Sequence, residues 1–160
     1  MPVRNRLAAI CACGVALCGS PAGAQSNNVR VTGLTDVAFG SLTDGDVVRA
    51  QNLCAFSSTS TKGYRVTASG SGSSGAFTLA NGGSTLAYEV QWNKLTGQTA
   101  GTSLSPNVAL TGQTSAATQQ QCNSGPATSA SLILIVRGTS AGAAAGGNYS
   151  GTLTLLIGPE

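Results

Sequence analysis

The chain has 160 residues, of which only 8% are charged, and its formal net charge is +3. It contains 22 glycines, five cysteines and no histidine. Without histidine, a Ser-His-Asp or Cys-His catalytic arrangement and a histidine-ligated metal are excluded. The few basic residues form no clustered face, which excludes a nucleic-acid-binding protein that depends on phosphate contacts. This composition argues against an enzyme and calls for no cofactor.

Residues 1–24 have the pattern of a secretory signal peptide. Arg4 and Arg6 form a short positive region, an apolar run follows over 7–17, and an A-x-A cleavage site ends at Ala24. A bilayer span needs about 20 apolar residues, so this run is too short to be a transmembrane helix, and no later segment approaches that length. We expect cleavage between Ala24 and Gln25, which leaves one domain over 25–160. A buried N-terminal helix is the weaker alternative.

The cysteines divide between the signal peptide and the exported domain. Cys11, Cys13 and Cys18 lie in the signal peptide. A lipid-anchored precursor is the weaker interpretation, because Cys11 and Cys18 follow large residues and Cys13 comes early in the apolar run. The exported domain keeps Cys54 and Cys122, which allow a single pairing in an oxidising compartment. We expect this disulfide, with two free thiols as the weaker alternative.

Apolar residues in the exported domain alternate with a period of two, which is typical of half-buried β-strands. The expected strands cover 35–39, 64–69, 77–79, 86–92, 132–136 and 153–157. The unbroken apolar run over 132–136 predicts a central strand that is covered on both faces. No window has helical spacing over three turns, so we expect little helix. About seven short strands separated by Gly-, Asn- and Asp-rich turns predict an all-β fold, a β-sandwich of immunoglobulin-like type.

Three short features have both a functional and a structural interpretation. Asp44-Gly45-Asp46 suggests a calcium loop, but only Asp36 is nearby as a third carboxylate, so a turn is the stronger interpretation and we expect no metal ion. The segment 71–75 is rich in glycine, but no helix follows it to bind a phosphate. Trp92 is in phase with the apolar residues of its strand, which favours a core position over a sugar-stacking surface.

A series of short motifs runs through nearly the whole exported domain. In chain order they occupy residues 33–40, 52–54, 63–68, 75–79, 86–93, 122–123 and 149–155. In this order, and with Cys54 and Cys122 in place, they resemble the spore coat protein U domain, which is found in subunits of archaic chaperone–usher pili.

The resemblance implies an incomplete immunoglobulin-like β-sandwich of the pilin type, whose last strand is supplied by a partner. A periplasmic chaperone would lend that strand first, and an outer-membrane usher would then exchange it for a strand of the neighbouring pilus subunit. The implied acceptor groove has Val37 and Phe39 on one side and Leu153, Leu155 and Ile157 on the other. Only three residues follow Ile157, so we expect the chain to have no closing strand of its own.

The function that the resemblance implies is that of a secreted structural subunit of a surface pilus or fibre, which supports adhesion and biofilm formation. Such a subunit passes through the periplasm to the surface of a Gram-negative bacterium. Only residues 25–34 precede the expected 35–39 strand, which is short for a donated strand, so a tip or terminating subunit is expected, with a minor subunit as the alternative. A stand-alone secreted β-sandwich that recognises a polysaccharide or a surface is the competing function.

Overall fold

A computed structural model of the chain describes residues 27–42 and 44–160. These residues form antiparallel strands and very little helix, as the sequence predicts. The strands are β1 (Val29–Thr32), β2 (Val47–Ser57), β3 (Gly63–Gly70), β4 (Thr78–Asn81), β5 (Ser84–Ala87), β6 (Glu89–Asn93), β7 (Thr102–Ser103), β8 (Leu110–Thr114), β9 (Ala130–Val136) and β10 (Leu153–Pro159). The helical segments are a 3₁₀ turn at Ser73–Gly75 and the short helix α1 (Gly138–Ala143).

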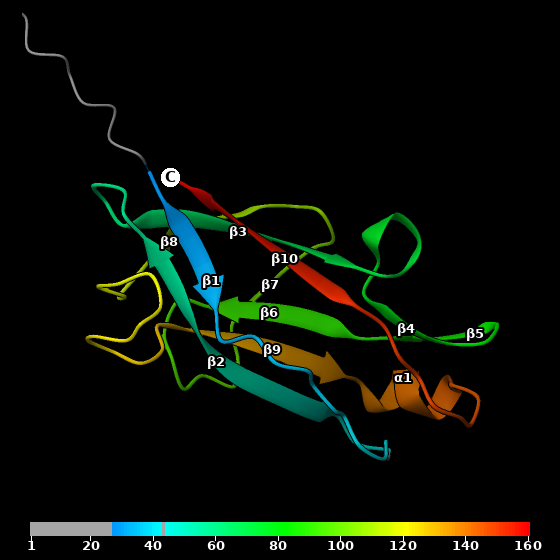
Figure 1. Cartoon of the computed structure of the whole chain (residues 1–160). Helices are drawn as coiled ribbons and strands as arrows, with labels where there is room; N and C mark the ends of the chain where they lie inside the picture. Colours follow the sequence, from blue (N-terminus) through cyan, green and yellow to red (C-terminus); the bar gives the residue numbers. More distant parts are fainter. Residues whose placement is uncertain (1–26, 43) are drawn as a thin grey trace, which may run out of the picture.

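Two sheets pack against each other around one core (Figure 1). The larger sheet has the strand order β1-β2-β9-β6-β7, the smaller one β10-β3-β8, and β4 with β5 forms a separate hairpin. Leu53, Trp92 and Leu132 of the larger sheet meet Tyr64 and Val66 of the smaller one in a single buried cluster. The fold is therefore the all-β sandwich that the sequence predicts.

Strand β9 is the centre of the larger sheet, where it pairs with β2 on one side and β6 on the other. All of its residues from Ala130 to Val136 are buried. An apolar run without alternation is expected where both faces of a strand are covered, so the prediction made for 132–136 is confirmed.

Trp92 lies in the core, as its phase along the strand predicts. It is 1% exposed, and its ring meets that of Tyr64 edge to face with the centroids 6.3 Å apart. The indole Nε1–H donates to the Tyr64 hydroxyl over 3.3 Å, so burial of the indole leaves its donor satisfied.

The expected strand over 86–92 is two strands rather than one. Leu86, Tyr88, Val90 and Trp92 are all buried in the predicted alternation. However, the chain changes partner at Tyr88, whose N–H donates to the carbonyl of Phe77. Residues before this point pair with β4, and those after it pair with β9. One continuous alternation of apolar residues therefore spans two strands that belong to different sheets.

The expected first strand over 35–39 is wrong. The first strand of the described residues is β1, which pairs with the far half of β2, and residues 33–42 form no strand. Gly33 directly follows β1 and has a φ of +86°, a conformation that side chains disfavour and that turns the chain out of the sheet. β2, with 11 residues, is the longest strand and was not predicted from the sequence.

The predicted signal peptide over 1–24 and its cleavage site between Ala24 and Gln25 lie outside the described residues. Within the described part of the chain, no helix has the length and apolar character needed to cross a membrane.

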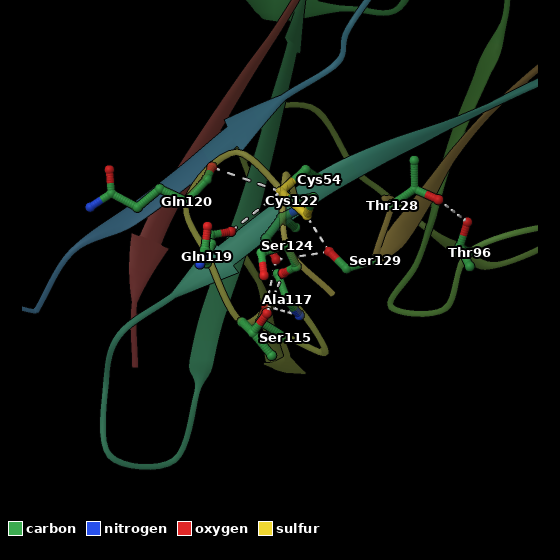
Figure 2. Close-up of a disulfide and its surroundings, with 12 residues drawn as sticks. Cys54, Thr96, Ser115, Ala117, Gln119, Gln120, Cys122, Ser124, Thr128 and Ser129 are labelled. Atoms are coloured by element: carbon green, nitrogen blue, oxygen red, sulfur yellow. Dashed lines mark hydrogen bonds between the residues drawn. A yellow bond between two sulfur atoms is a disulfide. The ribbon is translucent and has the colours of Figure 1, made fainter. Parts of the chain in front are cut away.

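Cys54 and Cys122 form a disulfide that joins β2 of the larger sheet to a loop 68 residues further along the chain (Figure 2). Both cysteines are buried with Ala117, and Phe56 packs against them. Nearby, Ser129 accepts from the N–H of Ala55 and donates to its carbonyl, so the strand keeps its backbone groups satisfied beside the loop. The disulfide therefore anchors a long connection that has little regular structure of its own.

Replacing both Cys54 and Cys122 with alanine should lower the free energy of unfolding by about 4 kcal/mol, because the cross-link restricts a long loop in the unfolded chain. Urea denaturation of the oxidised protein and of the variant measures this difference. Reduced wild-type protein is the control, since it lacks the bond but keeps both side chains. A loss of less than about 1 kcal/mol would show that the loop is held by its packing instead.

Candidate functional site

The edges of the two sheets meet where β1 and β10 lie side by side (Figure 1). Among the described residues, β1 pairs only with β2, and β10 pairs only with β3. Neither strand forms a ladder with the other, so this side of the sandwich has two strand edges with unpaired backbone groups. Beyond the end of β1 the two edges diverge, and residues 33–42 run opposite the beginning of β10.

A hollow of about 320 Å³ lies between this segment and β10. Four of the five residues predicted for the acceptor groove line it: Val37 and Phe39 on one wall, and Leu153 and Leu155 on the other. Ile157 is not among the lining residues; it lies further along β10, opposite Val66 of β3, and packs on the core. Side chains on β10 alternate between its two faces, and those of Leu153 and Leu155 point inward. Leu156, which lies between Leu155 and Ile157, is 68% exposed.

The floor of the hollow consists of core residues that were not predicted as part of the site. Leu132 and Leu134 of β9 form it together with Leu79 and Tyr88. The ring of Tyr88 lies 6.4 Å from that of Phe39, centroid to centroid. Burial raises the pKa of the Tyr88 phenol, so this group stays neutral. The groove therefore offers an apolar surface to any side chain that enters it.

A second hollow of about 840 Å³ continues from the first. The two share Asp36, Val37, Phe39, Leu79 and Gly151 in their linings, so they form one groove along the 33–42 segment. The far wall of the second hollow is the glycine- and alanine-rich stretch that follows α1, with small side chains that leave the space open.

The 33–42 segment is held beside β2 by side chains instead of a backbone ladder. Gln51 accepts from the Thr35 N–H over 3.0 Å and donates from Nε2 to the Thr35 carbonyl over 3.4 Å. Arg49 donates from Nε to the carbonyl of Ala38 over 3.1 Å and from Nη2 to that of Phe39 over 2.8 Å. These contacts satisfy backbone groups of Thr35, Ala38 and Phe39 in a segment that lacks strand partners.

The same two residues explain why the groove opens at this place. Leu53 and Ala55 of β2 face the core, and side chains two residues apart share a face of a strand, so Arg49 and Gln51 are on the core-facing side as well. At these two positions the core-facing side of β2 changes from apolar to polar. Burying an arginine and a glutamine among leucines is costly, so the core ends there and a hollow remains.

The described carboxylates that come closest to basic groups lie outside the groove. Arg137 contacts Asp46 over 2.7 Å and Glu89 over 2.6 Å. The Gly138 N–H and the Arg137 guanidinium lower the pKa of Asp46, and the guanidinium lowers that of Glu89. Both carboxyl groups are thereby held ionised, and neither is held protonated as a general acid would be. Among residues 27–42 and 44–160 no group of acidic and cysteine side chains is arranged to bind a metal ion.

No protein-family model matches the chain, and no curated protein matches it. One solved structure, described as a chaperone–tip adhesin complex vital for the activation of CFA/I fimbriae biogenesis, contains a chain of similar fold, with a TM-score of 0.52 at 17% sequence identity. The match covers 83% of this chain and 42% of that chain, so this chain spans less than half the length of the matched one. At this identity the likeness shows the fold alone. The resemblance to the spore coat protein U domain has no support from a matching family model.

Replacing Arg49 with alanine should release the 33–42 segment, because the guanidinium holds two of its carbonyls. We expect backbone amides in this segment to exchange with solvent about tenfold faster, since a net contribution of about 1 kcal/mol is typical for such hydrogen bonds. Hydrogen exchange read by mass spectrometry measures the change. Arg65→Ala is a matched control, because Arg65 donates to the Pro159 carbonyl on another part of the sandwich. Equal exchange in the two variants would mean that Arg49 does not hold the segment.

Proposed function

We propose that this chain is a structural subunit of a surface pilus or fibre of the chaperone–usher type, and that its groove receives a β-strand from another polypeptide. One observation carries the proposal: the open edge of β10 borders an apolar groove. Among the described residues β10 pairs only with β3, and the hollow of about 320 Å³ lies along its other side.

Addition of a strand would both pair the open edge of β10 and fill the groove beside it. A strand placed beside β10 would make main-chain hydrogen bonds to it, while its alternate side chains entered the groove above Leu132 and Leu134. Left open, an apolar strand edge is a template for aggregation. Exchange of one lent strand for a better-fitting one would release free energy, so assembly would need no cofactor.

The identity of the partners follows from the resemblance to the spore coat protein U domain, with the fimbrial structure of similar fold as support. We infer a periplasmic chaperone, an outer-membrane usher and neighbouring pilus subunits. Export would begin with the signal peptide over 1–24, and the subunit would pass through the periplasm to the surface of a Gram-negative cell. A role in adhesion and biofilm formation is inferred by analogy with that family.

A tip or terminating position in the fibre is supported by the pairing of β1 with a strand of its own chain. Val29 and Val31 pack against the core, and β1 pairs with β2 of its own chain. After cleavage at Ala24, residues 25–28 would precede β1, and this segment is shorter than the roughly five to six residues of a typical strand. Such a subunit would accept a strand without giving one, and a fibre would end with it.

Leucine-to-alanine changes on β10 test the groove directly. In Leu153→Ala/Leu155→Ala the side chains that line the groove are truncated, and we expect the affinity for the strand-lending partner to fall about thirtyfold, from a loss of about 2 kcal/mol of apolar contact. Leu156→Ala is the matched control, because Leu156 lies on the same strand and is 68% exposed. The tagged precursor is expressed in the organism that produces it, and the complex is recovered from the periplasm and weighed by intact mass.

The expected result is a one-to-one complex for the wild type and for Leu156→Ala, and mostly free protein for the double variant. Circular dichroism of each protein checks that the double variant is folded. A wild-type chain recovered as a lone, protease-resistant monomer would contradict the proposal and favour a stand-alone binding module. Equal recovery of the complex with both variants would show that the partner binds elsewhere.

A further inference from the structure

One acidic residue belongs to the lining of the groove. Asp36 belongs to the linings of both hollows, at the place where they join. Every other residue that lines either hollow is uncharged. In a chain with only 8% charged residues, this single charge in an otherwise uncharged lining is a distinctive feature.

The described residues provide Asp36 with no cation. The ion pairs among them are those of Arg137 with Asp46 and Glu89. Arg49 is the basic residue that reaches the same segment, and it donates to the carbonyls of Val48, Ala38 and Phe39. Asp36 is exposed in the open groove, so water solvates its charge there.

A strand that fills the groove would remove part of this water. Loss of solvation around an unpaired carboxylate is costly, and a nearby positive charge offsets that cost. The apolar contacts do not fix the position of the strand, because a pattern that alternates every two residues fits equally well after a slip of two. Such a slip moves every side chain by about 7 Å, which is enough to take a cation away from Asp36.

We propose that the strand which fills this groove carries a lysine or an arginine at the polar position that passes Asp36, and that this ion pair selects the register of the strand. The inference rests on the proposed function, since it assumes that a strand enters the groove. Asp36 then acts in specificity: apolar side chains provide most of the affinity, and the carboxylate distinguishes one strand, and one register, from another.

Synthetic peptides test this proposal with defined probes. Each has about a dozen residues of alternating valine and threonine, a soluble tail and a fluorescent label, and the central threonine is replaced by lysine, glutamine or glutamate. Fluorescence anisotropy measures their affinity for the mature oxidised protein, for Asp36→Asn and for Asp44→Asn. Asp44 is a matched control, because it is an exposed aspartate that lies outside both linings.

We expect wild-type protein to bind the lysine peptide about three- to fivefold more tightly than the glutamine peptide, and the glutamate peptide more weakly than either. Asp36→Asn should abolish this order, Asp44→Asn should keep it, and high salt should reduce it. Equal binding of the three peptides by the wild type, or the same order in Asp36→Asn, would overturn this inference and leave the groove proposal intact. Failure of every peptide to bind would overturn both.

Discussion

The free edge of β10 is the constraint on which the rest of the structure depends. Backbone N–H and C=O groups in a sheet need partners, and those on one side of β10 find them in β3. On the other side β1 lies close without pairing, and residues 33–42 turn away. An unpaired edge next to a groove has the geometry that strand addition would use, and several features of the sandwich keep this edge open and the groove shaped.

The groove keeps its shape because the strands around it are held by pairing, ion pairs and a disulfide of their own. β9 is buried on both faces and supplies the floor from the centre of the larger sheet. Arg137 ties β6 to the beginning of β2 through Glu89 and Asp46, and the disulfide fixes the far half of β2. Arg49 and Gln51 hold the 33–42 wall by side-chain hydrogen bonds, with no backbone ladder between this segment and β2.

How far the sequence predicts the site depends on whether a strand follows the simple alternation. β10 does, so Leu153 and Leu155 were found, and the unbroken apolar run of β9 was recognised as a central strand. β2 was missed because Arg49 and Gln51 occupy core-facing positions, where alternation predicts apolar residues. The same two side chains explain the error at 35–39: that segment has the pattern of a strand, but its hydrogen-bond partners are side chains, which no local pattern reveals.

Hydrogen exchange along β10, resolved residue by residue, tests most directly whether this edge is open and receives a strand. In an antiparallel strand, successive amides point alternately to opposite sides. In the isolated protein, the amides that face β3 should be protected, and those that face the groove should exchange rapidly. In the complex with its partner, the groove-facing amides should slow by about a hundredfold or more, as expected for newly formed strand hydrogen bonds. Equal protection of all β10 amides in the isolated protein would mean that the edge is already closed, and unchanged exchange in the complex would mean that no strand is added there.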